Sequence, residues 1–200
     1  MRLVKWSAVV ALSALTLAGC VSTGQVGTPT PATTTAGSKT STSATSAPSD
    51  RPKDIKLDGL DPCKALSAND QKQLGTVVTQ PDQSDVVEGV KSPACTFLTG
   101  PGASKVYSYA VHLVTGKGID YWNSAGNLDI AEKKVAGFPA KQVTFKGTSS
   151  VDCSVAVDVA DGQQVFVQFL PIGRDTTQDV MCQNAAKGAE LALATLQTLK

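Results

Sequence analysis

The chain has few of the side chains that carry out catalysis. Its 200 residues include one histidine, His112. Hydrolysis by a serine nucleophile needs a histidine placed between that serine and a carboxylate, and the chain has no G-x-S-x-G motif. His112 alternates with the bulky residues of a predicted strand, so we expect it to face solvent. The sequence therefore predicts no catalytic residue and a protein that is not an enzyme.

Neither basic nor acidic residues predominate in the sequence. The 18 basic and 17 acidic residues give a formal charge of +1, and no block of like charges occurs. Nucleic-acid binding, which relies on a basic patch, is not expected. Carboxylates such as Asp152, Asp158 and Asp161 lack the spacing of a calcium loop. The "GKG" at 116–118 lacks the rest of a phosphate loop. We expect no cofactor and no metal.

The N-terminal apolar run, Ala8 to Ala18, is too short to span a membrane, which takes about 20 apolar residues. Arg2 and Lys5 precede it. A basic segment, an apolar segment and small residues together form the layout of a secretory signal, predicted here over residues 1–19. Removal of that signal takes the formal charge from +1 to −1.

Leu17-Ala18-Gly19-Cys20 resembles the bacterial lipobox. The resemblance implies that signal peptidase II cuts before Cys20 and that the Cys20 sulfur carries a diacylglycerol. An ordinary signal with an incidental cysteine is the alternative. Stable anchoring takes two or more acyl chains, which lipoprotein maturation supplies. We therefore expect a lipid-anchored protein on the extracytoplasmic side of the cell membrane, with the membrane as its first partner.

Residues 20–53 hold the lipidated cysteine and a segment rich in Thr, Ser, Pro, Gly and Ala. Such a segment cannot bury enough apolar surface to offset its ordering entropy. We predict a disordered linker, either a bare spacer or one that carries O-linked glycans on its Thr-Pro pattern.

The remaining cysteines are Cys63, Cys95, Cys153 and Cys182. Four cysteines in an exported domain indicate two disulfides. A zinc site, the alternative, usually draws its ligands in close pairs, which are absent from this sequence. Three pairings are open. We favour Cys63–Cys95 and Cys153–Cys182, because each closes a loop of about thirty residues between neighbouring elements, which stabilises by roughly 3 kcal/mol.

The sequence from residue 54 to 200 predicts one α+β domain. Helix signals, including the cap pair Ser67 and Asp70, lie between 61 and 75, and residues 76–93 read mainly as loop. The longest alternations occur at 105–115, with Tyr107, Tyr109, Val111 and Leu113 inward, and in a hairpin turning at Asp161-Gly162. Shorter elements are a strand at "ACTFLT", a helix at "GIDYWNSAG" and a strand after "VAGFPA".

A final helix is predicted from about Thr177 to Leu199. It carries one stripe of small and apolar residues: Cys182, Ala186, Ala189, Leu193 and Leu196. Hairpin signals dominate and no βαβ repeat occurs, so we expect an antiparallel β-sheet with helices packed on it and two disulfides.

Several short motifs in this order resemble the actinobacterial lipoprotein family of unknown function DUF3558. They are "DPC" opening a helix, "ACTF" in a strand, "GFPA", "CSVAVDV" in a hairpin and a cysteine in the last helix. Phe97 departs from the family pattern, in which tryptophan is expected. The resemblance spans about Leu57 to the end and implies an envelope-exposed domain from a high-GC Gram-positive bacterium. It implies no activity.

Three classes of function follow. The first is a non-enzymatic binding or scaffold domain, with an envelope protein as partner. The second is a carrier for an apolar, lipid-like envelope ligand, which would need a concave pocket of a few hundred Å³ between sheet and helix. The third is a glycan hydrolase, which would need two facing carboxylates about 5 to 9 Å apart. The first is favoured, because the residues for catalysis are missing.

Overall fold

The computed structural model describes residues 50–147, 151–173 and 175–199. The predicted signal over residues 1–19, the lipid attachment at Cys20 and the linker as far as residue 49 lie outside the described residues and stay predictions.

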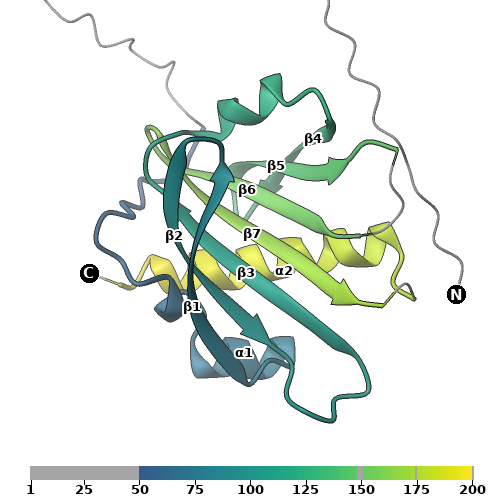
Figure 1. The fold of residues 1–200 in the computed structure, drawn as a ribbon. Coiled ribbons are helices and arrows are strands. Elements are labelled where there is room, and N and C mark those ends of the chain that lie inside the picture. Colours follow the sequence, from purple (N-terminus) through teal and green to yellow (C-terminus); the bar gives the residue numbers. More distant parts are fainter. Residues whose placement is uncertain (1–49, 148–150, 174, 200) are drawn as a thin grey trace, which may run out of the picture. The chain divides into compact units, whose positions relative to one another are not determined.

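One antiparallel sheet of seven strands forms the domain (Figure 1), in the order β1-β2-β3-β7-β6-β5-β4. The chain builds β1 to β3 as a meander, moves to the opposite edge, and returns through β4 to β7, so that β7 pairs with β3. The α+β prediction is confirmed. The strands are β1 (Val78–Val87), β2 (Val90–Leu98), β3 (Val106–Val114), β4 (Leu128–Val135), β5 (Phe138–Phe145), β6 (Cys153–Ala160) and β7 (Gln163–Ile172).

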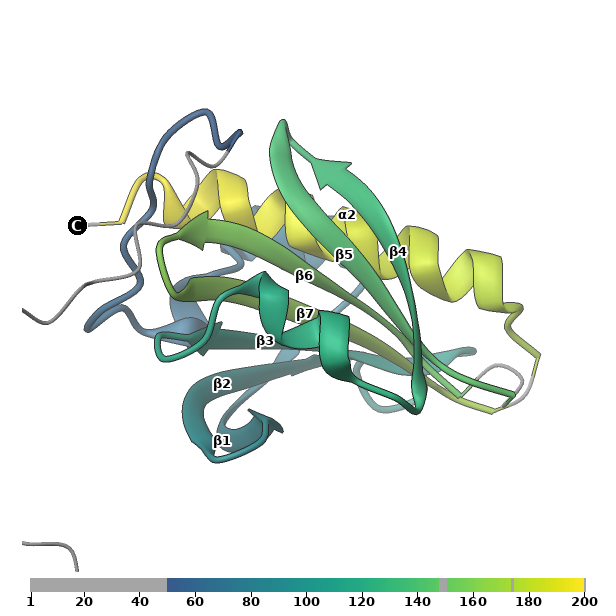
Figure 2. The ribbon, with the colours of Figure 1, turned by 90° about the horizontal axis from the view of Figure 1, so that it is seen from above.

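The long C-terminal helix α2 (Gln178–Leu196) lies across one face of the sheet (Figures 1 and 2). Its buried side consists mostly of small residues, as the predicted stripe required. At Gly188 the helix lies so close to the sheet that a Cβ would come within 2.9 Å of the Tyr109 ring and 3.2 Å of Val167. Glycine therefore permits the close approach of α2 to the sheet.

The main hydrophobic core fills the space between α2 and the sheet. The predicted alternation is confirmed there, since the inward residues of the 105–115 strand and of the hairpin belong to this core or, in the case of Tyr107, pack against it while partly buried. Phe97, the departure from the family pattern, is fully buried in the same core. Gly162 at the hairpin turn has a φ of 69°, the left-handed conformation that glycine adopts without strain.

Both predicted disulfides are present, Cys63–Cys95 and Cys153–Cys182, each with 5.0 Å between Cα atoms. Each ties a helical segment to the sheet. The opening helix is split into a 3₁₀ turn, η1 (Pro62–Lys64), and a short helix, α1 (Ala68–Leu74). The split follows the second cap signal, because Ser67 and Asp70 form a capping box that starts α1.

The face of the sheet opposite α2 carries a second, smaller core. The link from β3 to β4 must pass from the middle of the sheet to its edge, and it contains the 3₁₀ helix η2 (Ile119–Ser124). The β1–β2 hairpin contributes to the same cover with Val86, Val87 and Val90. The sheet is thus buried on both sides over part of its area.

Two segments differ from the sequence prediction. Residues 76–93, read as mainly loop, form β1 and the first part of β2, so that reading was wrong. β1 is an edge strand whose residues are mostly exposed on both faces, which removes the alternation that marks a strand. β4 is not among the strands that the sequence predicts, and it too is an edge strand, most of whose residues are exposed or partly exposed.

The ordered contacts of the domain begin before the predicted boundary at residue 54. Arg51 donates from Nη1 to both carboxylate oxygens of Asp158 at 2.8 and 2.9 Å, and from Nη2 to Asp161 at 2.6 Å. Ile55 then donates its N–H to the Val159 carbonyl at 2.7 Å. Residues 51–55 are therefore attached to the end of the β6–β7 hairpin.

Candidate functional site

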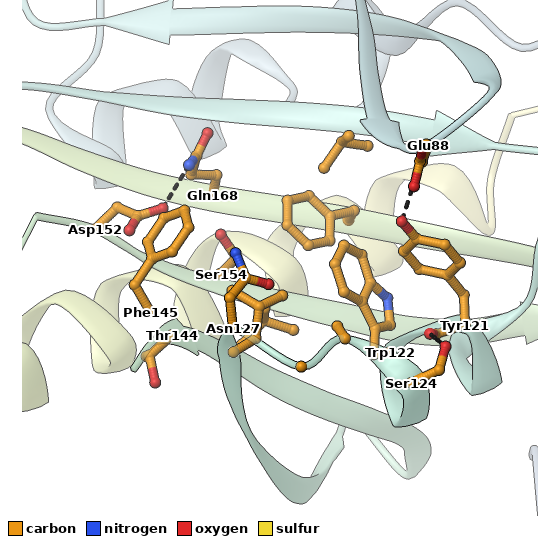
Figure 3. A pocket seen from close by; sticks show the side chains of 16 residues that line it. Glu88, Tyr121, Trp122, Ser124, Asn127, Thr144, Phe145, Asp152, Ser154 and Gln168 are labelled. Atoms are coloured by element: carbon orange, nitrogen blue, oxygen red, sulfur yellow. Dashed lines mark hydrogen bonds between the residues drawn. The ribbon is translucent and has the colours of Figure 1, made fainter. Parts of the chain in front are cut away.

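A pocket of about 500 Å³ lies on the η2 side of the sheet (Figure 3). Its floor comes from β5, β6 and β7, and its walls come from η2, the loop that follows η2, and the β1–β2 turn. The volume falls within the range of pockets that bind small molecules, about 300–1,000 Å³. The pocket arises because the η2 connection bridges the sheet without filling the space beneath it.

Aromatic rings form the apolar part of the pocket. Trp122 of η2 stacks on Phe166 of β7, with 5.0 Å between ring centroids and 20° between ring planes. Tyr121 packs edge-on against Trp122, also at 5.0 Å. Val143 and Leu128 add aliphatic surface. An apolar ligand body would thus contact a rigid, stacked pair of rings.

Buried hydrogen bonds fix η2 over the sheet. Gln164, which is fully buried, accepts from the Trp122 indole N–H at 2.7 Å and donates to the carbonyls of Lys117 and Gly118. The buried Lys141 of β5 donates to Asn123 and to Glu132. These contacts hold Trp122 in one position, so the aromatic wall of the pocket is fixed by the fold.

The other end of the pocket is polar and centres on Asp152, the residue before β6 (Figure 3). Only 6% of this residue is exposed. Its Oδ2 accepts from Gln168 Nε2 at 2.5 Å, whereas its Oδ1 has no hydrogen-bond partner among the described residues. The Asp152 carbonyl accepts from Gln178 of α2 at 2.8 Å, which fixes the backbone. The carboxylate is therefore held with one oxygen unsatisfied.

Burial changes the acidity of the Asp152 carboxyl group. Loss of hydration raises the pKa of Asp152, and the hydrogen bond from Gln168 opposes that effect in part. An unsatisfied buried oxygen costs stability, and a donor arriving in the pocket would recover it. The buried, half-satisfied Asp152 carboxylate is therefore the main chemical feature of the pocket.

The prediction that His112 faces solvent was wrong. His112 is 5% exposed and lies beneath the second core, with its ring 5.7 Å from that of Phe166. Neither ring nitrogen has a hydrogen-bond partner among the described residues. Burial lowers the pKa of His112 to about 4, and the nearby Asp82 carboxylate offsets this only in part. The imidazole is neutral at ordinary pH and does not line the pocket.

The described residues that line the pocket include two carboxylates, Asp152 and Glu88, and no histidine, cysteine, lysine or arginine. Figure 3 places these two carboxylates at opposite ends of the pocket. They do not form the facing pair that a glycan hydrolase uses. Over residues 50–147, 151–173 and 175–199, no cluster of three or more metal-ligating side chains occurs. The arrangement suits reversible binding of a small molecule.

The sequence signalled parts of this site but not their assembly. Trp122 lies in the helix predicted at "GIDYWNSAG", and Asp152 is one of the isolated carboxylates of the sequence. The sequence does not mark Gln164 and Gln168 as site residues, because a glutamine on the outer face of a strand is usually solvated. A polar residue within the strongly apolar "QVFVQFL" was the one available signal.

The predicted anchor residue, Cys20, lies outside the described part of the chain. Within that part, no helix combines the length and apolar character needed to cross a bilayer.

Comparisons with known proteins give a family and no more. A family model described as "Protein of unknown function (DUF3558)" matches residues 15–195. No curated protein matches the chain, and no solved structure does. Because the match covers nearly the whole domain and extends into the N-terminal region, the chain belongs to the DUF3558 family of proteins of unknown function.

Proposed function

We propose that this protein is a lipid-anchored binding protein of the cell envelope that holds a small amphipathic molecule in the pocket beneath η2. The observation that carries the proposal is the pocket itself, about 500 Å³ with stacked aromatic rings in its wall and an unsatisfied buried carboxylate at its end. A pocket between sheet and helix is the feature that distinguishes a carrier from a plain scaffold.

The expected lipid anchor would keep the pocket close to the membrane surface. Cleavage before Cys20 and diacylglycerol on its sulfur would leave the domain on a linker of roughly thirty residues at the outer face of the cytoplasmic membrane. A flexible coil of that length spans on the order of 30 Å on average. The domain would therefore stay near the bilayer, from which an amphipathic ligand could be drawn.

The same side chains support a non-enzymatic role. The pocket contains a fixed acceptor and aromatic surface, but the residues described there offer no nucleophile with a neighbouring base. Reversible occupancy is the function that these groups support best.

A protein-docking role is the second candidate, and a separate observation favours it. Val106, Leu170 and Ile172 are 42%, 42% and 67% exposed. Val106 and Ile172 are cross-strand partners on the face that carries the pocket, and Leu170 lies two residues away on that same face. An envelope protein could contact this apolar strip beside the pocket.

The test is to identify what co-purifies with the full chain from its own membranes. Val143 lines the pocket and is nearly buried, so Val143→Trp would fill the cavity. Val77→Trp is the matched control, because Val77 is 70% exposed and does not line the pocket. Urea unfolding of each variant confirms that it is folded.

We expect organic extracts of the wild type and of Val77→Trp to contain the same small molecule, and extracts of Val143→Trp to lack it. Absence of any bound small molecule from the wild type, or equal recovery from both variants, would reject the carrier role. Recovery of a protein whose binding is lost in Ile172→Asp would support the docking role instead.

A further inference from the structure

The charge of the pocket restricts what can enter it. Its described lining carries two carboxylates and no cationic side chain. The nearby lysines already have partners, since Lys146 donates to the Gly126 carbonyl at 3.0 Å and Lys141 is paired with Glu132 and Asn123. A ligand with a phosphate or carboxylate head would meet like charge there with no cation among the described lining residues to compensate it, which is unfavourable where water is excluded.

The polar end of the pocket lacks a donor. Gln168 occupies one oxygen of Asp152, and the other oxygen has no hydrogen-bond partner among the described residues. Asp152 and Gln168 both line the cavity, together with Ser154, which is 2% exposed. A cation at this position would form a charge-assisted hydrogen bond and neutralise the buried carboxylate at the same time.

The wall beyond this end is compatible with the same ligand. Trp122, Phe166 and Tyr121 line the pocket, so an apolar body held there would contact aromatic carbon. Phe145, 45% exposed, extends the apolar surface to the rim near Asp152.

We propose that the ligand is an amphipathic amine whose ammonium group pairs with Asp152 while its apolar body lies against Trp122 and Phe166. This assignment depends on the proposed function, because it names the ligand class of the same pocket. It also assigns the buried carboxylate a role: Asp152 recognises the charged end of the ligand.

The test compares three probes with the same eight-carbon chain: octylamine, octanol and octanoate. Cleavage before Cys20 removes Trp6, so the lipid-anchored protein held in phosphatidylcholine nanodiscs has Trp122 as its sole tryptophan, and its fluorescence reports occupancy of the pocket. Empty nanodiscs measured in parallel remove the contribution of lipid partitioning. Each probe is titrated at pH 7 into the wild-type pocket and into two variants.

Asp152→Asn removes the charge and keeps a side chain of the same size, and Glu88→Gln is the matched control at the exposed rim. We expect octylamine to bind the wild type more tightly than octanol and octanoate. Asp152→Asn should weaken octylamine on the order of tenfold to a hundredfold and leave octanol unchanged. Glu88→Gln should weaken octylamine by at most about fivefold, because exposed charge pairs are screened.

The outcomes separate this inference from the proposed function. If octanol and octanoate bind as tightly as octylamine, the pocket binds ligands but the amine assignment is wrong. If octylamine affinity is unchanged in Asp152→Asn, or falls more in Glu88→Gln, Asp152 is not its partner and the inference fails. If no probe binds and no small molecule co-purifies, the binding function itself is rejected.

Discussion

Acid should destabilise this domain through His112, a residue buried on the face of the sheet opposite α2. The row across the strands runs from Asp82 through Ala94 and His112 to Phe166, so His112 has a strand on each side and the second core above it. Its ring nitrogens have no hydrogen-bond partner among the described residues. The folded protein therefore disfavours the charged imidazolium.

The size of the effect follows from the pKa of His112. Burial lowers that pKa to about 4, against 6.5 for an exposed histidine. Well above pH 6.5 the imidazole is neutral in both states and contributes no pH dependence. As the pH falls from 6.5 to 4, the unfolded chain binds a proton that the folded chain excludes. Since one pKa unit corresponds to about 1.4 kcal/mol, the free energy of unfolding should fall by about 3 kcal/mol over this range.

The perturbation is His112→Leu, which replaces the imidazole with an apolar side chain. At pH 7 the variant should be as stable as the wild type or more stable, because two unsatisfied buried nitrogens are removed at a gain of about 1–3 kcal/mol. Between pH 7 and pH 4 the wild type should lose about 3 kcal/mol more than the variant. Acid effects from carboxylates are common to both proteins and cancel in the difference.

The assay is urea unfolding followed by far-ultraviolet circular dichroism at pH 7, 6, 5 and 4, with the disulfides intact. A loss of about 3 kcal/mol is a large part of the total stability of a domain, about 5–15 kcal/mol. Parallel pH dependences for the wild type and His112→Leu would refute the reasoning, because they would show that His112 takes up its proton as easily in the folded state as in the unfolded one.

Three further predictions concern the helix, the disulfides and the anchor. Gly188→Ala should destabilise the domain by about 1 kcal/mol in thermal or urea unfolding. The clash of the new Cβ with Tyr109 outweighs the gain of roughly 1 kcal/mol in helix propensity. A more stable variant would show that α2 can move away from the sheet. Replacing Cys153 and Cys182 together by alanine should lower the free energy of unfolding by about 2–5 kcal/mol. In a thiol-labelling assay the other disulfide should stay closed, and new labelling of Cys63 would contradict the pairing. Cys20→Ser should move the protein from the membrane fraction to the culture supernatant, detected by immunoblot, and unchanged membrane retention would argue against a lipid on Cys20.

The sequence by itself determined the elements whose pattern is local. The β6–β7 hairpin could be predicted because Val155 and Val157 alternate with smaller or polar residues and Asp161-Gly162 forms the turn. The face of α2 followed from the spacing of its small residues, and the cysteine spacing favoured the observed disulfides. In each of these cases the feature is specified by the spacing of residues along the sequence.

The edge strands show where local pattern fails. β1 is exposed along most of its length and contains Pro81, so neither alternation nor strand propensity marks it. Its extended form depends on backbone hydrogen bonds to β2, which are available to nearly any sequence. Only the sheet as a whole shows that this segment is a strand.

The candidate site was decided by the tertiary structure. Whether the polar face of a strand meets water depends on what crosses it. Here η2, in the connection from β3 to β4, covers the face that carries His112 and packs on Phe166 of β7, and it helps to enclose Asp152 in a pocket. The alternation of β3 correctly placed His112 opposite the main core, but it could not indicate a second core on that side. Periodicity assigns a residue to a face, whereas burial depends on connections and packing that join residues far apart in the sequence.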